Sequence, residues 1–418
     1  MSDHSFIKEV IKEKPISRRK VCIRIVVLII AAILFGAVAA LAFVYIKPMI
    51  ENSIEARKAP EAIDITNDDE GITKAAAVET PTPTPQVTQA AAEVSSELGL
   101  AEYKKLYQEM KVVSQNAEKA IVTVVGIKSL IDYFDDPYDN KGQLSGVIIA
   151  NNGRELIVLT EYRVVEGVDK IQVIFSNEKT ADAEYQKHDE NTGMAIIKIG
   201  LEQLDAETLA QISTAPLGNS YRLTQGEPVI AIGSPSGSSD SIAFGAITSV
   251  TNKLSSWDTE YALTTTDILG SEGGSGVLLD LDGEIIGIMA QSYSSENNTV
   301  TALAISPIRS LIQTLSNNGE IRSIGIKGRE ITEEIAKNTN LPSGLYVEMT
   351  KPDSPAMQAG IMNGDVIVKM NDETIMTIAD YRRELDKCVV GGVVKLTVMR
   401  NGTAGYEEIV FDVMVQAL

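Results

Sequence analysis

The chain has 418 residues, of which 44% are hydrophobic, and a formal net charge of −20 at neutral pH. This length leaves room for two or three domains. The acidity excludes nucleic acid as a partner, because phosphate binding requires a basic surface. A content of 31 glycines and few aromatic residues is typical of a turn-rich β protein.

The N-terminal part of the chain has the pattern of a membrane anchor. Residues 1–24 carry seven basic and three acidic side chains, a net charge of +4, so the rest of the chain carries −24. Residues 25–46 are 22 consecutive uncharged residues, enough to span a bilayer as a helix. The basic flank predicts a cytoplasmic tail over 1–24 and an extracytoplasmic bulk, as in a single-pass protein of the cell membrane. The alternative is a signal peptide cleaved near Ala37-Val38-Ala39, but the apolar run continues to Ile46 and favours an uncleaved anchor.

Residues 47–97 are predicted to be an extracytoplasmic linker. The segment is acidic and rich in alanine, and it contains three Thr-Pro pairs between Thr80 and Pro85. Such a composition favours extended polyproline II and cannot build a core. Beyond it, apolar side chains at roughly helical spacing predict a lead-in helix from Ser96 to about Lys119.

The two cysteines predict neither a disulfide nor a metal site. Cys22 lies at the edge of the predicted anchor and Cys388 near the C-terminus, so the two cannot reach each other. Neither has the spacing of a metal ligand. The sequence therefore predicts no metal and no cofactor.

From Ala120 the chain changes to short β-rich runs separated by Gly, Asn, Asp and Ser. Many short strands at this spacing indicate a barrel or a sandwich. A helix at about Ser306–Asn317 is expected to close the region. The predicted strands include 121–127, 146–150, 156–160, 171–175, 195–199, 229–232, 243–250, 276–279 and 285–290.

Two segments in this β-rich region carry a strong resemblance. Ser145–Ile149, followed by Ile157–Val165, resembles the trypsin-like domain of the HtrA/DegP serine proteases. The resemblance implies a mainly β fold in which residues 98–318, with the lead-in helix, form two six-stranded β-barrels.

The same resemblance implies where the members of a catalytic triad would lie. The family's Leu-Thr-Asn-x-His-Val-Val run ends a strand and supplies the general base, and this chain has Arg163 at the histidine position. A guanidinium stays protonated and cannot take a proton from a hydroxyl. The family's aspartate segment corresponds to residues 189–198, and the aspartate position is Gly193, which offers no acceptor.

The nucleophile position has two interpretations. Counting from Thr266-Asp267 puts Ser275 at the family's serine, whereas another frame puts Glu272 there. The first is favoured, but one residue is then missing after Ser275, so the loop that forms the oxyanion hole is altered. His188 is the only histidine besides His4 in the N-terminal tail, and it is interpreted as a solvated loop residue rather than a replacement base.

Residues 322–418 resemble a PDZ domain of the HtrA type, an α+β unit. Ser323, Ile324, Gly325 and Ile326 match the loop whose backbone amides capture a peptide's terminal carboxylate, while the peptide adds as a strand to the sheet edge. The alternative is a PDZ domain whose groove is filled by its own chain or used for packing. Further matches are Gly344–Val347, Ser354–Ile361, Asn363–Ile367, Asp380–Leu385 and Gly392–Arg400.

Together these features predict an HtrA-like pseudoprotease rather than an enzyme. It would act as an extracytoplasmic scaffold for C-terminal peptides or unfolded proteins, or as a regulator of an active protease; the sequence does not separate these two roles. The family implies a homotrimer or a hetero-oligomer with an active paralogue. The alternative is an active serine endopeptidase of envelope protein quality control, in which Ser275 uses a non-standard base. Arg163 and Gly193 argue against that alternative.

Overall fold

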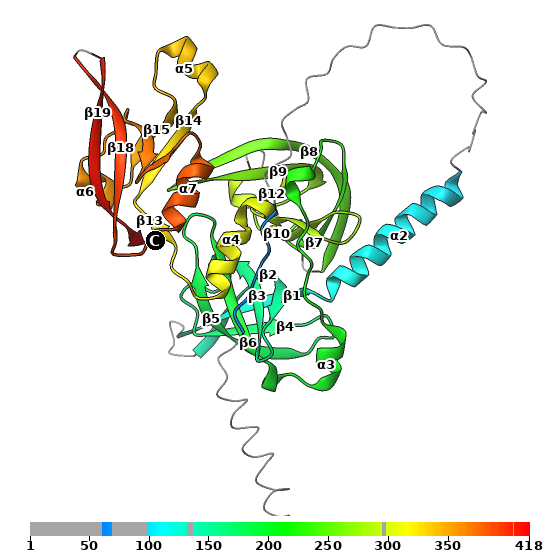
Figure 1. Ribbon diagram of the computed structural model, residues 1–418. Coiled ribbons are helices and arrows are strands. Elements are labelled where there is room, and N and C mark those ends of the chain that lie inside the picture. Colours follow the sequence, from blue (N-terminus) through cyan, green and yellow to red (C-terminus); the bar gives the residue numbers. More distant parts are fainter. Residues whose placement is uncertain (1–60, 69–98, 132–136, 239, 295–297, 404) are drawn as a thin grey trace, which may run out of the picture. The chain divides into compact units, whose positions relative to one another are not determined.

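Two closed β-barrels and a separate sheet make up the part of the chain that the computed structural model describes (Figure 1). The described residues are 61–68, 99–131, 137–238, 240–294, 298–403 and 405–418. Among them, no helix is both long and apolar enough to cross a membrane. The predicted tail and anchor, residues 1–24 and 25–46, lie outside the described residues, as does most of the predicted linker.

Each barrel has six antiparallel strands, which confirms the predicted double barrel. The first has the strand order β1-β2-β3-β6-β5-β4 and the second the order β10-β11-β12-β9-β8-β7. The strands of the first are β1 (Ile121–Ile131), β2 (Pro137–Asn151), β3 (Glu155–Glu161), β4 (Lys170–Ile174), β5 (Thr180–His188) and β6 (Met194–Gly200). Those of the second are β7 (Pro228–Ser234), β8 (Ser241–Ser256), β9 (Thr259–Leu269), β10 (Ser275–Leu279), β11 (Ile285–Met289) and β12 (Thr299–Ala304).

Strands at the junction of the barrels are apolar on both faces because each face lies in a different core. In β6, Ala195 and Ile197 point into the core of the first barrel, whereas Met194 and Ile196 join the core between the barrels. The strand's side-chain alternation therefore produces a continuous apolar run rather than an alternating one. The predicted helix after the barrels is α4 (Ile305–Ser316), and its buried side chains belong to the same central core.

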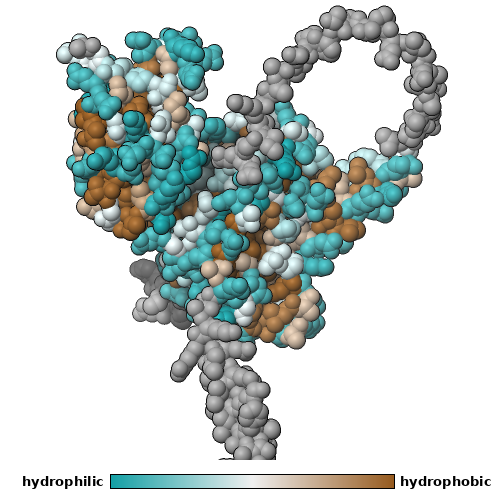
Figure 2. Space-filling view, in the orientation of Figure 1, coloured by the Kyte–Doolittle hydropathy of each residue, from teal (hydrophilic) through white to brown (hydrophobic). Residues whose placement is uncertain are grey.

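The lead-in helix is α2 (Leu100–Glu118), as predicted, but it is mostly exposed. Only Met110 and Ser114 are buried along its length. Figure 2 shows apolar side chains on the surface of this helix, among them Leu100, Tyr103 and Leu106. The helix therefore contributes little to the core of the barrels. A short helix, α3 (Ala206–Gln211), follows the first barrel.

Residues 61–68 lie on α4, although the sequence assigns them to the linker. The amide of Ile63 donates to Asn317 Oδ1 at 2.8 Å, and Asn317 Nδ2 donates back to the Ile63 carbonyl at 2.8 Å. Arg309 of α4 donates to the Thr66 carbonyl at 2.8 Å and forms an ion pair with Asp68 at 3.0 Å. Side chains of α4 thus satisfy the backbone of a segment that has almost no apolar core of its own.

The C-terminal region is a separate α+β unit, as predicted. Its main sheet has the order β14-β15-β16-β18-β19, with β17 paired to β16, and β13 pairs with β20. Its strands are β13 (Arg322–Ser323), β14 (Ile326–Ile331), β15 (Gly344–Thr350), β16 (Val366–Met370), β17 (Glu373–Thr374), β18 (Val393–Gly402), β19 (Gly405–Met414) and β20 (Gln416–Ala417). Its helices are α5 (Glu333–Thr339), α6 (Pro355–Ala359) and α7 (Ile378–Asp386). It has its own apolar core, centred on the fully buried Tyr381.

Candidate functional site: the junction of the barrels and a carboxylate-binding loop

The structure brings the three predicted triad positions together between the barrels. Arg163 lies in a short 3-10 helix, Tyr162–Val164, directly after β3, and Ser275 is the first residue of β10. The Tyr162 amide donates to the Gly193 carbonyl at 2.7 Å, and Arg163 Nη2 donates to the Gly274 carbonyl at 3.4 Å. Residues that are distant in sequence therefore meet where a triad would be assembled.

Arg163 can donate at this place but cannot accept. Its Nε lies 2.8 Å from Glu161 Oε2, and 45% of its side chain is exposed. A guanidinium carries only N–H donors and no lone pair for a proton. The Arg163 side chain therefore cannot act as a general base.

Gly193 lies in a tight turn with a φ of +69°, in the left-handed region that glycine adopts freely and that aspartate also tolerates. Its amide donates to the Asp189 carbonyl at 2.9 Å, while Asp189 Oδ2 accepts from the amide and the hydroxyl of Thr192 at 2.9 and 2.7 Å. Asp189 Oδ1 is buried without a hydrogen-bond partner, and burial raises the pKa of this carboxyl above its ordinary value. The Asp189 carboxylate therefore makes its hydrogen bonds within the turn, to Thr192.

Ser275 is buried rather than presented to a substrate. Only 1% of the residue is exposed, and it pairs with Ser234 of β7 inside the sheet. The amide of Gly274, which precedes it, donates to the Ser271 carbonyl at 2.8 Å and closes a turn. Glu272, the alternative candidate, lies exposed in that turn. The turn that precedes Ser275 is therefore closed by a backbone hydrogen bond of its own.

His188 is not a free base either. It ends β5 and stacks on Tyr162, with the ring centroids 3.6 Å apart and an angle of 4° between the planes. Its Nδ1 lies 2.5 Å from the hydroxyl of Tyr185. The interpretation as a solvated loop residue misses this packing, which holds the ring against two tyrosines.

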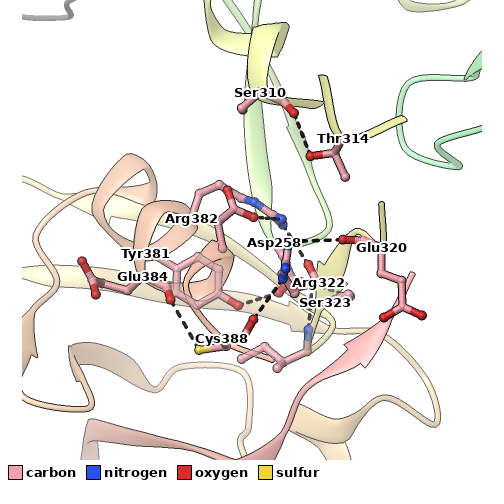
Figure 3. A network of polar contacts seen from close by, with 12 residues as sticks. Asp258, Ser310, Thr314, Glu320, Arg322, Ser323, Tyr381, Arg382, Glu384 and Cys388 are labelled. Carbon is pink, nitrogen blue, oxygen red and sulfur yellow. Dashed lines mark hydrogen bonds and ion pairs between the residues drawn. The ribbon is translucent and has the colours of Figure 1, made fainter. Parts of the chain in front are cut away.

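The predicted carboxylate-binding loop holds a carboxylate in this structure. Asp258, in the turn between β8 and β9, places its side chain against residues 323–326 (Figure 3). Its Oδ2 accepts from the Ser323 hydroxyl at 2.6 Å and from the amides of Ile324 and Gly325 at 3.0 and 2.8 Å. Its Oδ1 accepts from the Ile326 amide at 3.0 Å and from the Tyr381 hydroxyl at 2.5 Å. All four residues predicted for this site therefore contact one carboxylate.

Sequence reasoning did not find Asp258 or Tyr381. An aspartate in a hairpin turn is common for local reasons, since Asp tolerates the left-handed conformation found here, with a φ of 59°. Its partners are 65 or more residues away, so no local pattern marks it. Burial is the main cause that raises the pKa of Tyr381 well above its ordinary value, and the neighbouring Asp258 carboxylate adds to it. This hydroxyl therefore stays protonated and donates.

Gly325 is required by the loop's own geometry. Its φ is +82°, and an added Cβ would lie 2.4 Å from Ser354 Cβ. The substitution Gly325→Val would therefore distort the domain. It is unsuitable as a test of binding.

The family comparisons agree with this architecture. A family model described as a trypsin-like peptidase domain matches residues 144–288, and a model described as a PDZ domain matches residues 322–406. The chain is thus a trypsin-fold protein with a C-terminal PDZ domain.

Comparison with individual relatives places the chain in a more specific family within the trypsin fold. The putative serine protease HhoA of Synechocystis sp. is 30% identical over 275 residues, which cover 62% of this chain and 68% of that protein. A probable periplasmic serine endoprotease DegP-like of Halomonas elongata is 30% identical over 266 residues, and the chain spans 54% of its length. A solved structure, HtrA-type protease AlgW with decapeptide, shares the fold with a TM-score of 0.55 at 22% identity, covering 74% of this chain and 98% of that one. The chain belongs to the HtrA-like family.

Proposed function

We propose that this protein is a catalytically inactive HtrA-like protein, anchored in the cell membrane through residues 25–46, whose PDZ domain binds the free C-termini of unfolded envelope proteins. The observation that carries the proposal is the loop at residues 323–326, which grips a carboxylate with three consecutive backbone amides. Backbone amides can do this without any catalytic residue, so the loop's function survives the loss of a triad.

Three features of the protease centre support the inactive part of the proposal. Arg163 has no acceptor for a proton, Gly193 has no carboxylate, and Ser275 is buried within the sheet. Proteolysis needs a base that can reach the nucleophile and amides that can hold the oxyanion. Binding without cleavage suits a scaffold that retains clients or a regulator that passes them to an active paralogue, with which this chain would form a mixed oligomer.

The carboxylate-capture prediction is tested with peptides of matched sequence. The Asp258→Ala variant is used because the Asp258 carboxylate no longer occupies its loop. An unstructured decapeptide that ends in a free Val carboxylate should bind this variant with a Kd on the order of micromolar, as expected for a short added strand. The same peptide with an amidated C-terminus should bind at least about 10-fold more weakly, because the captured charge is absent. Fluorescence polarisation gives both constants. Equal binding of the two peptides would exclude carboxylate capture as the function of this loop.

The anchor is tested by fractionation of cells that express the full chain. The protein should sediment with membranes, resist extraction by high salt and dissolve in detergent, since about 20 buried apolar residues hold a helix in the bilayer. Protease added to intact spheroplasts should remove the PDZ domain, because the bulk of the chain is expected outside. A soluble mature form that begins near Ala40 would instead establish cleavage of a signal peptide.

A further inference from the structure

Asp258 makes two of the contacts that a peptide C-terminus makes with a PDZ domain. Its carboxylate accepts from the loop amides, and its own backbone amide donates to the Ile326 carbonyl at 2.6 Å, the first rung of an added strand. The residue is only 1% exposed. Figure 3 shows it between the loop that begins at Ser323 and the hydroxyl of Tyr381. The donors that would recognise a partner are therefore already in use.

We infer that Asp258 is an internal ligand of the PDZ domain, and that a partner's free C-terminal carboxylate binds by displacing the β8–β9 turn. The inference rests on the proposed function, because it concerns the same loop. The three amides and two hydroxyls that surround Asp258 cannot serve a second carboxylate at the same time. Two carboxylates in one buried site would also repel each other strongly. Binding of a C-terminus and binding of Asp258 are consequently exclusive.

Two contacts beside the turn are weak. Lys351 of the PDZ domain lies 3.5 Å from Glu190, but the two side chains are 34% and 62% exposed, and exposed pairs contribute little. The Ser255 hydroxyl reaches the Gly328 carbonyl at 3.5 Å, a long hydrogen bond. A small cavity of about 60 Å³ borders the same region, lined by Thr259, Arg322 and Arg382 among others.

A peptide can gain contacts that the turn does not make. β14 is an edge strand of its sheet, paired only with β15 along its length. Asp258 forms one backbone hydrogen bond with this strand, whereas an extended peptide can continue the ladder over several residues. The turn has the advantage of being tethered, which gives it a high effective concentration. A partner therefore displaces the turn when the free energy of its additional backbone hydrogen bonds, together with its concentration, exceeds the advantage that tethering gives Asp258.

The affinity of the free-acid decapeptide for three forms of the full, detergent-solubilised chain tests the inference. If Asp258 occupies the loop in about 90–99% of molecules, its removal should tighten the apparent Kd by roughly 10- to 100-fold. Asp258→Ala should show this gain relative to the wild type. Glu260→Ala is the matched control: it removes the same charge two residues away, from a side chain paired with Lys253 rather than with the loop, and should bind like the wild type.

The outcomes separate this inference from the proposed function. If Asp258→Ala and the wild type bind the free-acid peptide equally and both reject the amide, the internal ligand is wrong and carboxylate capture stands. If Asp258→Ala binds both peptides equally, carboxylate capture itself is wrong. A gain of the same size in Glu260→Ala would show a general effect of charge and would also overturn the inference.

A second measurement needs no substitution. Trp257, the only tryptophan of the chain, adjoins Asp258, and its carbonyl accepts from Asn191 at 3.1 Å. Saturating free-acid peptide should shift its emission, because the turn leaves its site, and the amidated peptide should not. Saturation by the free-acid peptide, verified by polarisation, without any change in the emission of Trp257 would show that the turn stays in place and would overturn the inference even if Asp258→Ala did not fold.

Discussion

Substituting Arg163→His and Gly193→Asp together is expected to leave the protein without turnover, although it restores two triad residue types. The serine would still lie buried in β10, with 1% of its surface exposed. The new aspartate could adopt the φ of +69° at position 193, but it would not expose the serine. Loss of one oxyanion donor alone costs about 10²- to 10³-fold in kcat. Casein hydrolysis should therefore remain at least about 10³-fold below that of a proteolytically active HtrA relative assayed beside it.

Labelling with a fluorophosphonate gives an independent readout of the same prediction. The double variant should not react at Ser275, because the reagent needs an exposed and activated hydroxyl. The triple variant that also carries Ser275→Ala is the control for labelling elsewhere. Casein cleavage near the level of the active relative, lost in the triple variant, would show that the loop can open and that the buried serine is not the barrier.

Arg309→Ala is expected to destabilise the barrels by about 3–5 kcal/mol, the usual range for removing one partner of a buried ion pair. Arg309 is 7% exposed and forms an ion pair with Asp68 at 3.0 Å. It also donates to the carbonyls of Thr66, Leu217 and Gly218, at 2.8, 2.8 and 2.9 Å. Its removal leaves these acceptors without a partner and detaches residues 61–68 from α4.

Urea unfolding measures this loss. Arg329→Ala is the matched control, since the Arg329 side chain is 77% exposed and pairs with Glu348 at the surface. It should cost less than about 1 kcal/mol. Limited proteolysis should also cut near residues 61–68 in Arg309→Ala but not in the control. A loss no larger than that of Arg329→Ala would contradict the role assigned to Arg309.

The sequence predicts the barrel strands that contain a compact run of apolar residues and misses those whose apolar residues are interspersed with polar or small ones. β6 and β7 read as continuous apolar runs because both of their faces are covered. β5, β9 and β12 were not among the predicted strands. β5 is mostly exposed or half-buried, β9 contains four threonines among its eleven residues, and four of the six residues of β12 are Thr or Ala. Their pairing depends on neighbours that are distant in sequence.

The candidate site also contains residues that the sequence predicts and residues that it does not. Residues 323–326 were predicted because a carboxylate-binding loop is a local feature of four consecutive residues. Asp258 was not, since its role depends on how the barrel hairpin meets a domain that follows it by 65 residues. Residues 61–68 were assigned to a linker on composition, and only the partners offered by α4 give them a fixed place. Composition indicates the structure that a segment favours by itself, but not the hydrogen-bond partners that neighbouring segments provide.

The turn that carries Trp257 and Asp258 belongs to the second barrel, whereas the loop it occupies belongs to the PDZ domain. Under the internal-ligand inference, a filled PDZ domain and a released hairpin occur in the same molecule. Thermodynamic linkage makes the relation reciprocal: a second protein that holds the released hairpin must raise the affinity for C-termini by the same factor by which C-termini raise the affinity for that protein. Occupancy of the PDZ domain would thereby change what the second barrel can bind.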